Sequence, residues 1–156
     1  CNLYGPNDNF DLKNSHFIPA LIKKFIQSNK NKKQEVEIWG SGNPKREVMY
    51  VEDIASAIFF IMKKKILKDK TLINYLKKRA VINVGSDIEY SIKKIAQIIS
   101  KTTNNKSKLK FNKKYPDGTP RKILDNRMIK KLGWRPKVSL LEGLNKTLDW
   151  YYKNYN

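Results

Sequence analysis

The apolar residues of this chain are divided among short segments, and loops rich in Gly, Pro, Asn and Lys separate those segments. No apolar run approaches the roughly 20 residues that cross a bilayer, and no signal-peptide pattern opens the sequence. With 156 residues, 40% of them hydrophobic, the chain has the size of one domain with a modest core. We therefore expect neither a membrane-spanning nor a secreted protein.

The cysteine and histidine content excludes two classes of site. Cys1 is the single cysteine, so the chain has no internal disulfide and no cysteine cage for zinc. His16 is the single histidine, which excludes a histidine-rich metal site. This content fits a reducing, cytoplasmic compartment, and no metal is expected.

The charge of the chain is strongly positive, with 33 Lys and Arg against 14 Asp and Glu, a formal net charge of +19. A chain with this charge is suited to bind a negatively charged partner, such as nucleic acid, an anionic membrane surface or a phosphorylated ligand. Only five of the 33 basic residues are arginine. Arginine is the side chain that most often recognises bases and binds phosphate through two hydrogen bonds at once. A biased lysine-rich composition explains the excess without a nucleic-acid partner, and a basic nucleic-acid-binding module is kept as an alternative.

The first half of the chain alternates between patterns of helix and strand. Apolar residues at helical spacing predict a helix that starts after His16, and the alternation at 35–39 predicts a strand with one exposed face. Residues 47–51 predict a second strand, and acids at positions 52 and 53 favour a helix that extends to about residue 66. The very basic stretch 63–79 indicates a solvated helix end and loop.

The second half continues the alternation. The apolar run 80–84 predicts a buried parallel strand, and Ser91 is expected to cap the next helix. A short strand follows around residues 109–111, and the loop 115–120 is rich in Pro and Gly. Asp125 is expected to cap a short helix that stops at Gly133, and residues 139–142 form a capping box for the last helix. The fold class is thus mixed α/β, more irregular than a self-contained doubly wound sheet.

Few residue patterns point directly to chemistry. The sequence contains no G-x-G-x-x-G, no P-loop and no G-x-S-x-G. Tyr90 and Lys94 have the spacing of a dehydrogenase pair, but we interpret them as an exposed tyrosine beside solvated lysines. His16 suits proton transfer near neutral pH, or it simply caps a helix.

Two loops have side chains suited to a phosphorylated ligand with a ring. Residues 39–46 join Trp39, whose face can stack on a ring, to Arg46, which can pair with phosphate. In the loop 116–121, the carboxylate of Asp117 could accept a hydrogen bond from a sugar hydroxyl. Each loop could equally be an ordinary turn, and spacing does not separate the two readings.

Together these segments resemble the C-terminal half of the GDP-L-fucose synthase family, a branch of the extended short-chain dehydrogenases with a Rossmann-like fold. The similarity covers the chain from Asn2 to about Tyr152. The motifs that carry it occur in order as NLYGP (2–6), DNF (8–10), NSH (14–16), WGSG (39–42), YVEDI (50–54), NVG (83–85) and PDGTPRK (116–122).

The resemblance implies an NADPH-dependent enzyme that epimerises C3 and C5 of GDP-4-keto-6-deoxy-D-mannose and then reduces C4 to give GDP-L-fucose. His16 matches the acid of the epimerisation, which lies near the nicotinamide, and Asn2 and Leu3 match the segment that lines the cofactor. The GDP-sugar site is implied for a further set of positions, namely Lys24, Trp39, Arg46 and Asp117.

The resemblance also implies what this chain does not supply. In the family, the glycine-rich cofactor loop and the catalytic Ser, Cys and Tyr-x-x-x-Lys lie in an N-terminal half, and Cys1 matches a position that is usually Thr. We therefore expect residues 1–156 to be the substrate-binding half of a larger enzyme, inactive alone and part of a homodimer when complete. Residues 50–100 are expected to return to the Rossmann sheet. Another nucleotide-sugar 4-epimerase or 4,6-dehydratase, or a non-catalytic remnant, remains an alternative.

Overall fold

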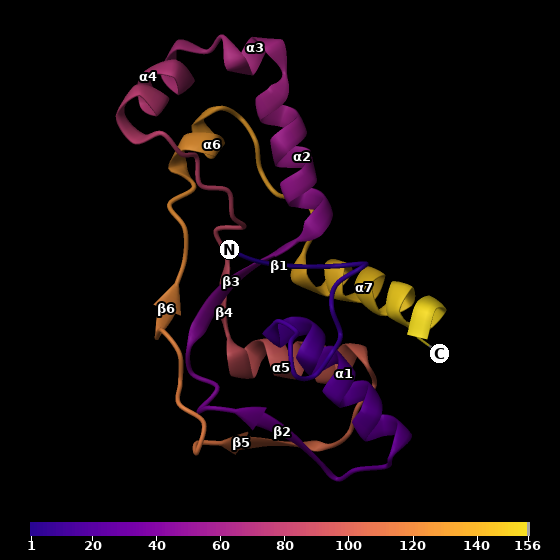
Figure 1. The fold of residues 1–156 in the computed structure, drawn as a ribbon. Helices are drawn as coiled ribbons and strands as arrows, with labels where there is room; N and C mark the ends of the chain where they lie inside the picture. Colours follow the sequence, from indigo (N-terminus) through magenta and orange to yellow (C-terminus); the bar gives the residue numbers. More distant parts are fainter. Residues whose placement is uncertain (156) are drawn as a thin grey trace.

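The computed structural model describes residues 1–155 and confirms the mixed α/β class (Figure 1). Helices and strands alternate along the chain, and many strands are short. In order they are β1 (Asn2–Tyr4), α1 (Phe17–Lys30), β2 (Glu35–Trp39), β3 (Lys45–Tyr50), α2 (Val51–Met62), α3 (Lys64–Leu67), α4 (Lys70–Arg79), β4 (Glu89–Ser91), α5 (Ile92–Thr102), β5 (Lys108–Asn112), β6 (Arg121–Lys122), α6 (Arg127–Lys131) and α7 (Leu140–Tyr155).

Strand β3 is the hub of a four-stranded sheet. Its C-terminal half pairs in parallel with β1, with Asn2 opposite Val48. Its N-terminal half pairs with β4 in antiparallel fashion and with β6 in parallel. β3 therefore joins segments that lie far apart in the sequence (Figure 1).

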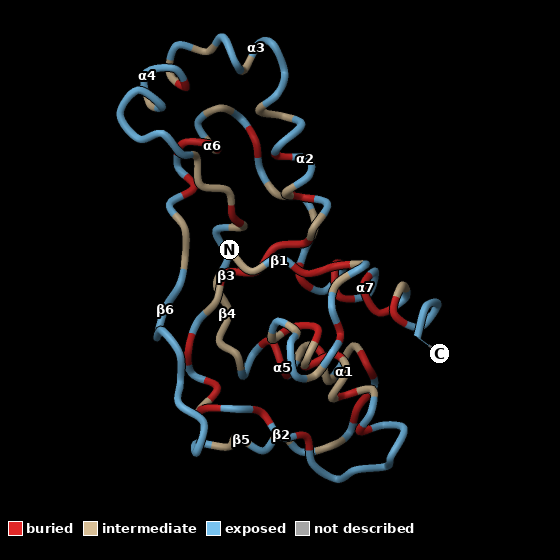
Figure 2. The backbone as a smooth tube through the Cα atoms, in the orientation of Figure 1, coloured by how far each residue is buried: buried red, intermediate tan, exposed pale blue. Residues whose placement is uncertain are grey.

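A smaller two-stranded parallel sheet, β2 with β5, lies at the far end of the molecule from α3 and α4 (Figure 1). β2 has the alternation that the sequence predicts, with Val36 and Ile38 buried and the residues between them exposed. These two side chains join Ile22 and Phe25 of α1 and Ile95 of α5 in the main core. The buried tube segments in Figure 2 follow this core and the β1–β3 pair.

A second, smaller core lies beside α2. It contains Met49 of β3, Ala57 of α2, Ile129 of α6 and Trp134, all buried. Trp134 also donates its Nε1–H to the Ser56 hydroxyl at 3.0 Å. This core holds α6 and Trp134 against β3 and α2.

Glu47 lies at the centre of β3 and is completely buried. Its carboxyl oxygens accept hydrogen bonds from the backbone N–H of Asp87 at 2.8 Å and of Leu124 at 3.0 Å, and from Nδ2 of Asn126 at 3.0 Å. A Cβ at Gly85 would collide with this carboxyl group, so only glycine fits there. One side chain therefore fixes two loops that are about 40 and 80 residues away in the sequence.

Asp53, in the first turn of α2, is also buried. Its two oxygens accept the backbone N–H groups of Lys137 and Val138, both at 3.0 Å. The sequence predicts an acid at the N-terminus of this helix, where it interacts favourably with the helix dipole. The structure adds a second role, because this acid also anchors the loop that leads into α7.

The prediction of a buried parallel strand at 80–84 is wrong for the part of the chain that the structure describes. Ala80 is the left-handed C-cap of α4, and Val81 is 64% exposed. Ile82 and Val84 pack against the second core, but within residues 1–155 no neighbouring strand completes a hydrogen-bonded ladder with them. Apolar composition alone does not make a strand when the pairing partner is missing.

The basic stretch 63–79 is also more ordered than predicted. The helix that starts at residue 51 ends at Met62 rather than near residue 66, because Lys63 is extended. α3 and α4 follow, and Asp69 caps α4 by accepting the N–H groups of Thr71 and Leu72. This N-cap, which lies among lysines, was not predicted from the sequence.

The other predicted elements are largely confirmed. α1 starts directly after His16, Ser91 caps α5, and the Ser139 hydroxyl accepts the N–H of Glu142 at the start of α7. The predicted cap of α6 is shifted: Asn126 is the N-cap, while Asp125 accepts the backbone N–H of Arg127 at 3.1 Å.

We expect Glu47→Ala to lower the free energy of unfolding by about 3 kcal/mol or more, because it removes the buried acceptor of three hydrogen bonds, two of them from backbone N–H groups. Chemical denaturation followed by circular dichroism measures this. Glu35→Ala is the matched control, since Glu35 is an exposed strand carboxylate paired with Lys110, and it should change stability little. Equal effects of the two substitutions would contradict the role given to Glu47.

Candidate functional site

Four of the predicted site residues lie on or beside two loops that contact each other. One begins with Trp39, the last residue of β2, and contains Ser41, and the other follows β5 and contains Tyr115 and Asp117. β2 and β5 are adjacent parallel strands, so their ends lie at the same edge and place the two loops side by side. We call residues 39–43 and 113–120 the paired loops.

Asp117 joins the paired loops directly. Its Oδ1 accepts the backbone N–H of Ser41 at 2.8 Å, and its Oδ2 accepts the Ser41 hydroxyl at 2.5 Å. These bonds from Ser41 hold the pKa of Asp117 below its ordinary value. Gly40 has φ of +81°, and a Cβ there would collide with the Asp117 carboxylate, so this turn requires glycine.

Arg46 is bound to the second of the paired loops from β3. Its Nη1 donates to the backbone carbonyls of Lys45 at 2.8 Å and Thr119 at 2.6 Å. Within residues 1–155 its Nε and Nη2 groups have no hydrogen-bond acceptor, so these donors can bind an anion.

Lys24 and Trp39 are in direct contact. The Lys24 ammonium lies 4.8 Å from the centre of the Trp39 ring and donates to the Glu37 carbonyl at 3.1 Å. Burial lowers the pKa of Lys24, and the nearby Glu37 partly offsets that effect. Both side chains line two neighbouring cavities, of about 350 and 210 Å³, which Leu12 also lines.

His16 and the β1 residues lie outside the paired loops. His16 is the exposed N-cap of α1, and its side chain makes no capping hydrogen bond. Asn2 uses its side-chain amide to donate to the Glu47 carbonyl at 3.0 Å, whereas Leu3 is 40% exposed. The structure thus brings Lys24 together with Trp39, and Arg46 with the loop of Asp117, but leaves the other three apart from them.

Three further residues of the paired loops and β2 were not predicted from the sequence, namely Ser41, Glu37 and Tyr115. Trp39 donates its Nε1–H to Glu37 Oε1 at 3.2 Å and stacks on the ring of Tyr115. The signal for Ser41 was its place between two glycines, and the signal for Tyr115 was an aromatic residue directly before the Pro-Asp-Gly turn.

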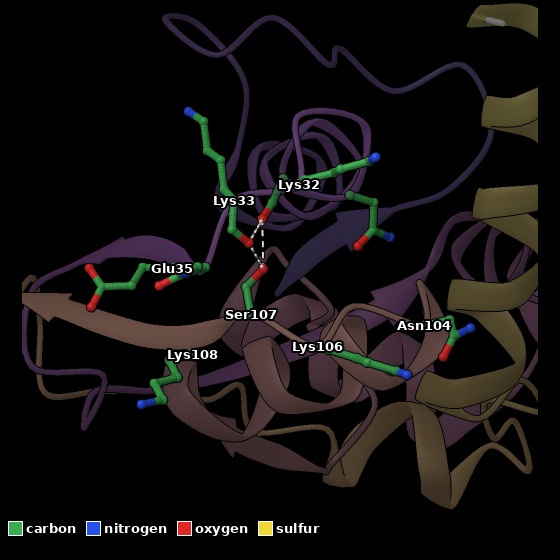
Figure 3. A pocket seen from close by; sticks show the side chains of 10 residues that line it. Lys32, Lys33, Glu35, Asn104, Lys106, Ser107 and Lys108 are labelled. Atoms are coloured by element: carbon green, nitrogen blue, oxygen red, sulfur yellow. Dashed lines mark hydrogen bonds between the residues drawn. The ribbon is translucent and has the colours of Figure 1, made fainter.

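A larger cavity, of about 530 Å³, lies where α1 and α5 end and contains none of the predicted site residues. Lysines at positions 32, 33, 106 and 108 surround it, and the Lys33 carbonyl accepts the Ser107 hydroxyl at 2.7 Å (Figure 3). In Figure 3, Lys33 and Lys108 extend to one side, while Lys32 and Lys106 extend to the other. Their ammonium groups therefore do not converge on a small anion.

We expect the Asp117 carboxyl to titrate below its ordinary pKa of 3.8, and Ser41→Ala to raise that pKa. Because the folded-state pKa is lowered, this contact stabilises the paired loops above the ordinary pKa, and the stabilisation is lost as pH falls through the lowered value. Carboxyl ¹³C shifts followed against pH measure it. Ser86→Ala, which removes a hydroxyl elsewhere, is the control, and an Asp117 pKa unmoved by Ser41→Ala would contradict the contact.

Comparison with known proteins places these residues in a family. Residues 1–85, more than half of the chain, match the sequence model of the NAD dependent epimerase/dehydratase family. GDP-L-fucose synthase 1 of Arabidopsis thaliana is 41% identical over 98% of this chain, and GDP-L-colitose synthase of Yersinia pseudotuberculosis is 40% identical over all of it. The chain spans 44% and 47% of these two relatives, respectively.

Solved structures agree on the fold. A GDP-L-fucose synthetase from Naegleria fowleri, crystallised with NADP, superposes on 99% of this chain with a TM-score of 0.84, and this chain covers 45% of it. At 24% identity that likeness concerns the fold, and it agrees with the extended short-chain dehydrogenase architecture expected from the motifs. The chain belongs to the NAD dependent epimerase/dehydratase family.

Proposed function

We propose that this chain is the GDP-sugar-binding half of a GDP-L-fucose synthase, the enzyme that converts GDP-4-keto-6-deoxy-D-mannose to GDP-L-fucose. One observation carries the proposal. Lys24, Trp39, Arg46 and Asp117, the positions that the family resemblance assigns to the GDP-sugar, lie on or against the paired loops, and Lys24 and Trp39 line two cavities there. Relatives named for two GDP-sugar products support the choice of nucleotide.

Each of these residues has a distinct task in that site. Lys24 and the open donors of Arg46 would offset the charge of the diphosphate. Trp39, whose ring is stacked on Tyr115 and lies beside Lys24, would offer the exposed part of its indole to an apolar group. Asp117 already accepts two bonds from Ser41, but a carboxylate has about four acceptor positions, which leaves room for a sugar hydroxyl.

The reduction at C4 would use NADPH, which supplies the hydride when bound. The residues of this chain fit only the nicotinamide end of that cofactor. Leu3 offers an exposed apolar side chain and His16 an imidazole without a capping bond, while the amide of Asn2 is bonded to Glu47 and holds the strand in place. No glycine-rich phosphate loop occurs in the sequence, so the pyrophosphate would bind to a separate N-terminal half.

His16 would act in the epimerisation. Loss of a proton from C3 or C5, next to the C4 ketone, to a base of the N-terminal half would give an enediolate or an enolate, respectively. An imidazolium could then return a proton to that carbon from the other face. The exposed position of His16 at the start of α1 leaves its ring free for this transfer.

Residues 50–100 would complete the Rossmann sheet of the whole enzyme, which would work as a homodimer.

A nucleotide-sugar 4-epimerase or 4,6-dehydratase of the same family is the competing function, and the base of the nucleotide separates the candidates. We expect the 156-residue chain to bind GDP-L-fucose more tightly than UDP-glucose or dTDP-glucose in isothermal titration calorimetry. Arg46→Ala should weaken GDP-L-fucose binding by about tenfold, because it removes a charge-assisted contact to phosphate.

Arg127→Ala is the matched control, since Arg127 is an exposed arginine paired with Asp125 outside the paired loops. It should leave the affinity unchanged, and both variants should keep the far-ultraviolet circular dichroism spectrum of the parent chain. Equal affinity for all three nucleotide sugars would contradict the proposal.

We also expect the purified chain to show no NADPH oxidation with GDP-4-keto-6-deoxy-D-mannose. The reason is that the family's catalytic Ser and Tyr-x-x-x-Lys lie in the half that this sequence does not include. Absorbance at the NADPH maximum measures the rate, and the same mixture without protein is the control. Turnover above that control would show that the chain contains a reductase centre of its own.

A further inference from the structure

Trp39 and Tyr115 form a stacked pair on the surface. Their ring centres are 4.4 Å apart with an angle of 16° between the planes, although Trp39 is 55% exposed and Tyr115 is 42% exposed. They come from different segments: Trp39 ends β2, and Tyr115 lies three residues beyond the end of β5. The stack is therefore a second contact between the paired loops, besides the bond between Ser41 and Asp117.

The indole of Trp39 is restrained on several sides. Its Nε1–H donates to Glu37 Oε1 at 3.2 Å, and the other oxygen of Glu37 accepts Nδ2 of Asn112 at 3.0 Å. Asn112 also forms the base of the turn that carries Tyr115, because its carbonyl accepts the Tyr115 N–H at 3.3 Å. Glu37 and Asn112 thus hold both rings in register, and the Lys24 ammonium lies over the Trp39 ring.

Tyr115 borders the same cavity as Lys24 and Trp39, the one of about 350 Å³. An exposed indole on a single bond would otherwise sample several rotamers, and a ligand would have to order it on binding. Stacking against Tyr115 keeps the indole in one orientation before any ligand arrives.

We infer that Tyr115 is a positioning residue for the nucleotide sugar, because it holds the Trp39 ring in the orientation that receives the ligand. This inference rests on the proposed function of the site. Stacked aromatic pairs contribute enough for their loss to weaken binding by about three- to tenfold. The tyrosine ring carries this role, so phenylalanine should replace it.

The test compares Tyr115→Ala and Tyr115→Phe with the unaltered 156-residue chain. Calorimetry gives the Kd for GDP-L-fucose, and quenching of tryptophan fluorescence by iodide reports the exposure of Trp39, since Trp134 is buried and Trp150 is partly buried. We expect Tyr115→Ala to raise the Kd about three- to tenfold and to increase quenching. Tyr115→Phe should match the parent in both, and far-ultraviolet circular dichroism should show that each variant keeps the parent's fold.

Tyr152→Ala is the matched control, because Tyr152 has similar exposure (38%) on α7 and should change neither quantity. If the parent chain and Tyr115→Ala bind with equal Kd, the inference is overturned while the proposed function stands. A lower Kd for Tyr115→Ala would also overturn it, since Tyr115 would then obstruct the ligand. If the parent chain does not bind GDP-L-fucose, the proposed function itself fails, and the inference fails with it.

Discussion

The arrangement of this chain depends on the buried carboxyl group of Glu47. It accepts bonds from the Asp87 and Leu124 backbones and from the Asn126 side chain, and so it fixes the segments on both sides of the α5–β5 unit. A buried carboxyl without such donors would be strongly destabilising, so the three donors and the acceptor require one another. Asp53 does the same for the loop before α7 through two backbone N–H groups. These two acids tie the second half of the chain to β3 and α2.

The same strand positions part of the candidate site. Successive side chains of a strand point to opposite faces, so the burial of Glu47 directs its neighbour Arg46 to the other face of β3. There Arg46 binds the Thr119 carbonyl, close to Asp117 and the loop that follows β2. Glu47, which is buried, and Arg46, which is proposed to contact phosphate, are thus neighbours in sequence whose side chains lie on opposite faces of β3.

Local patterns predicted much of this structure. The alternation of β2, the apolar spacing of α1 and the caps of α5 and α7 all follow from side chains close in sequence. The apolar run 80–84 was predicted wrongly, because a strand also needs a partner that periodicity does not reveal. The Asp69 cap was overlooked because the lysines around it suggested a loop.

The candidate site could be predicted only in part, for a related physical reason. Lys24, Trp39, Arg46 and Asp117 were named from the family resemblance, but the contacts that order Arg46 and Asp117 join residues more than 70 positions apart. Ser41, Glu37 and Tyr115 also act through contacts of this kind, to Asp117, Asn112 and Trp39, and their local sequence context does not identify those partners. The excess of lysine left binding to nucleic acid, a polyanion, as one alternative. The lysines around the larger cavity extend in different directions and do not converge (Figure 3).

Amide hydrogen exchange with and without GDP-L-fucose tests the central claim, that the paired loops form the nucleotide-sugar site. The account predicts slower exchange in residues 39–43 and 113–120 when the ligand is added, with α4 unchanged as an internal reference. Protection confined to the lysine-lined cavity around residues 32–35 and 104–108, or no protection anywhere, would contradict it.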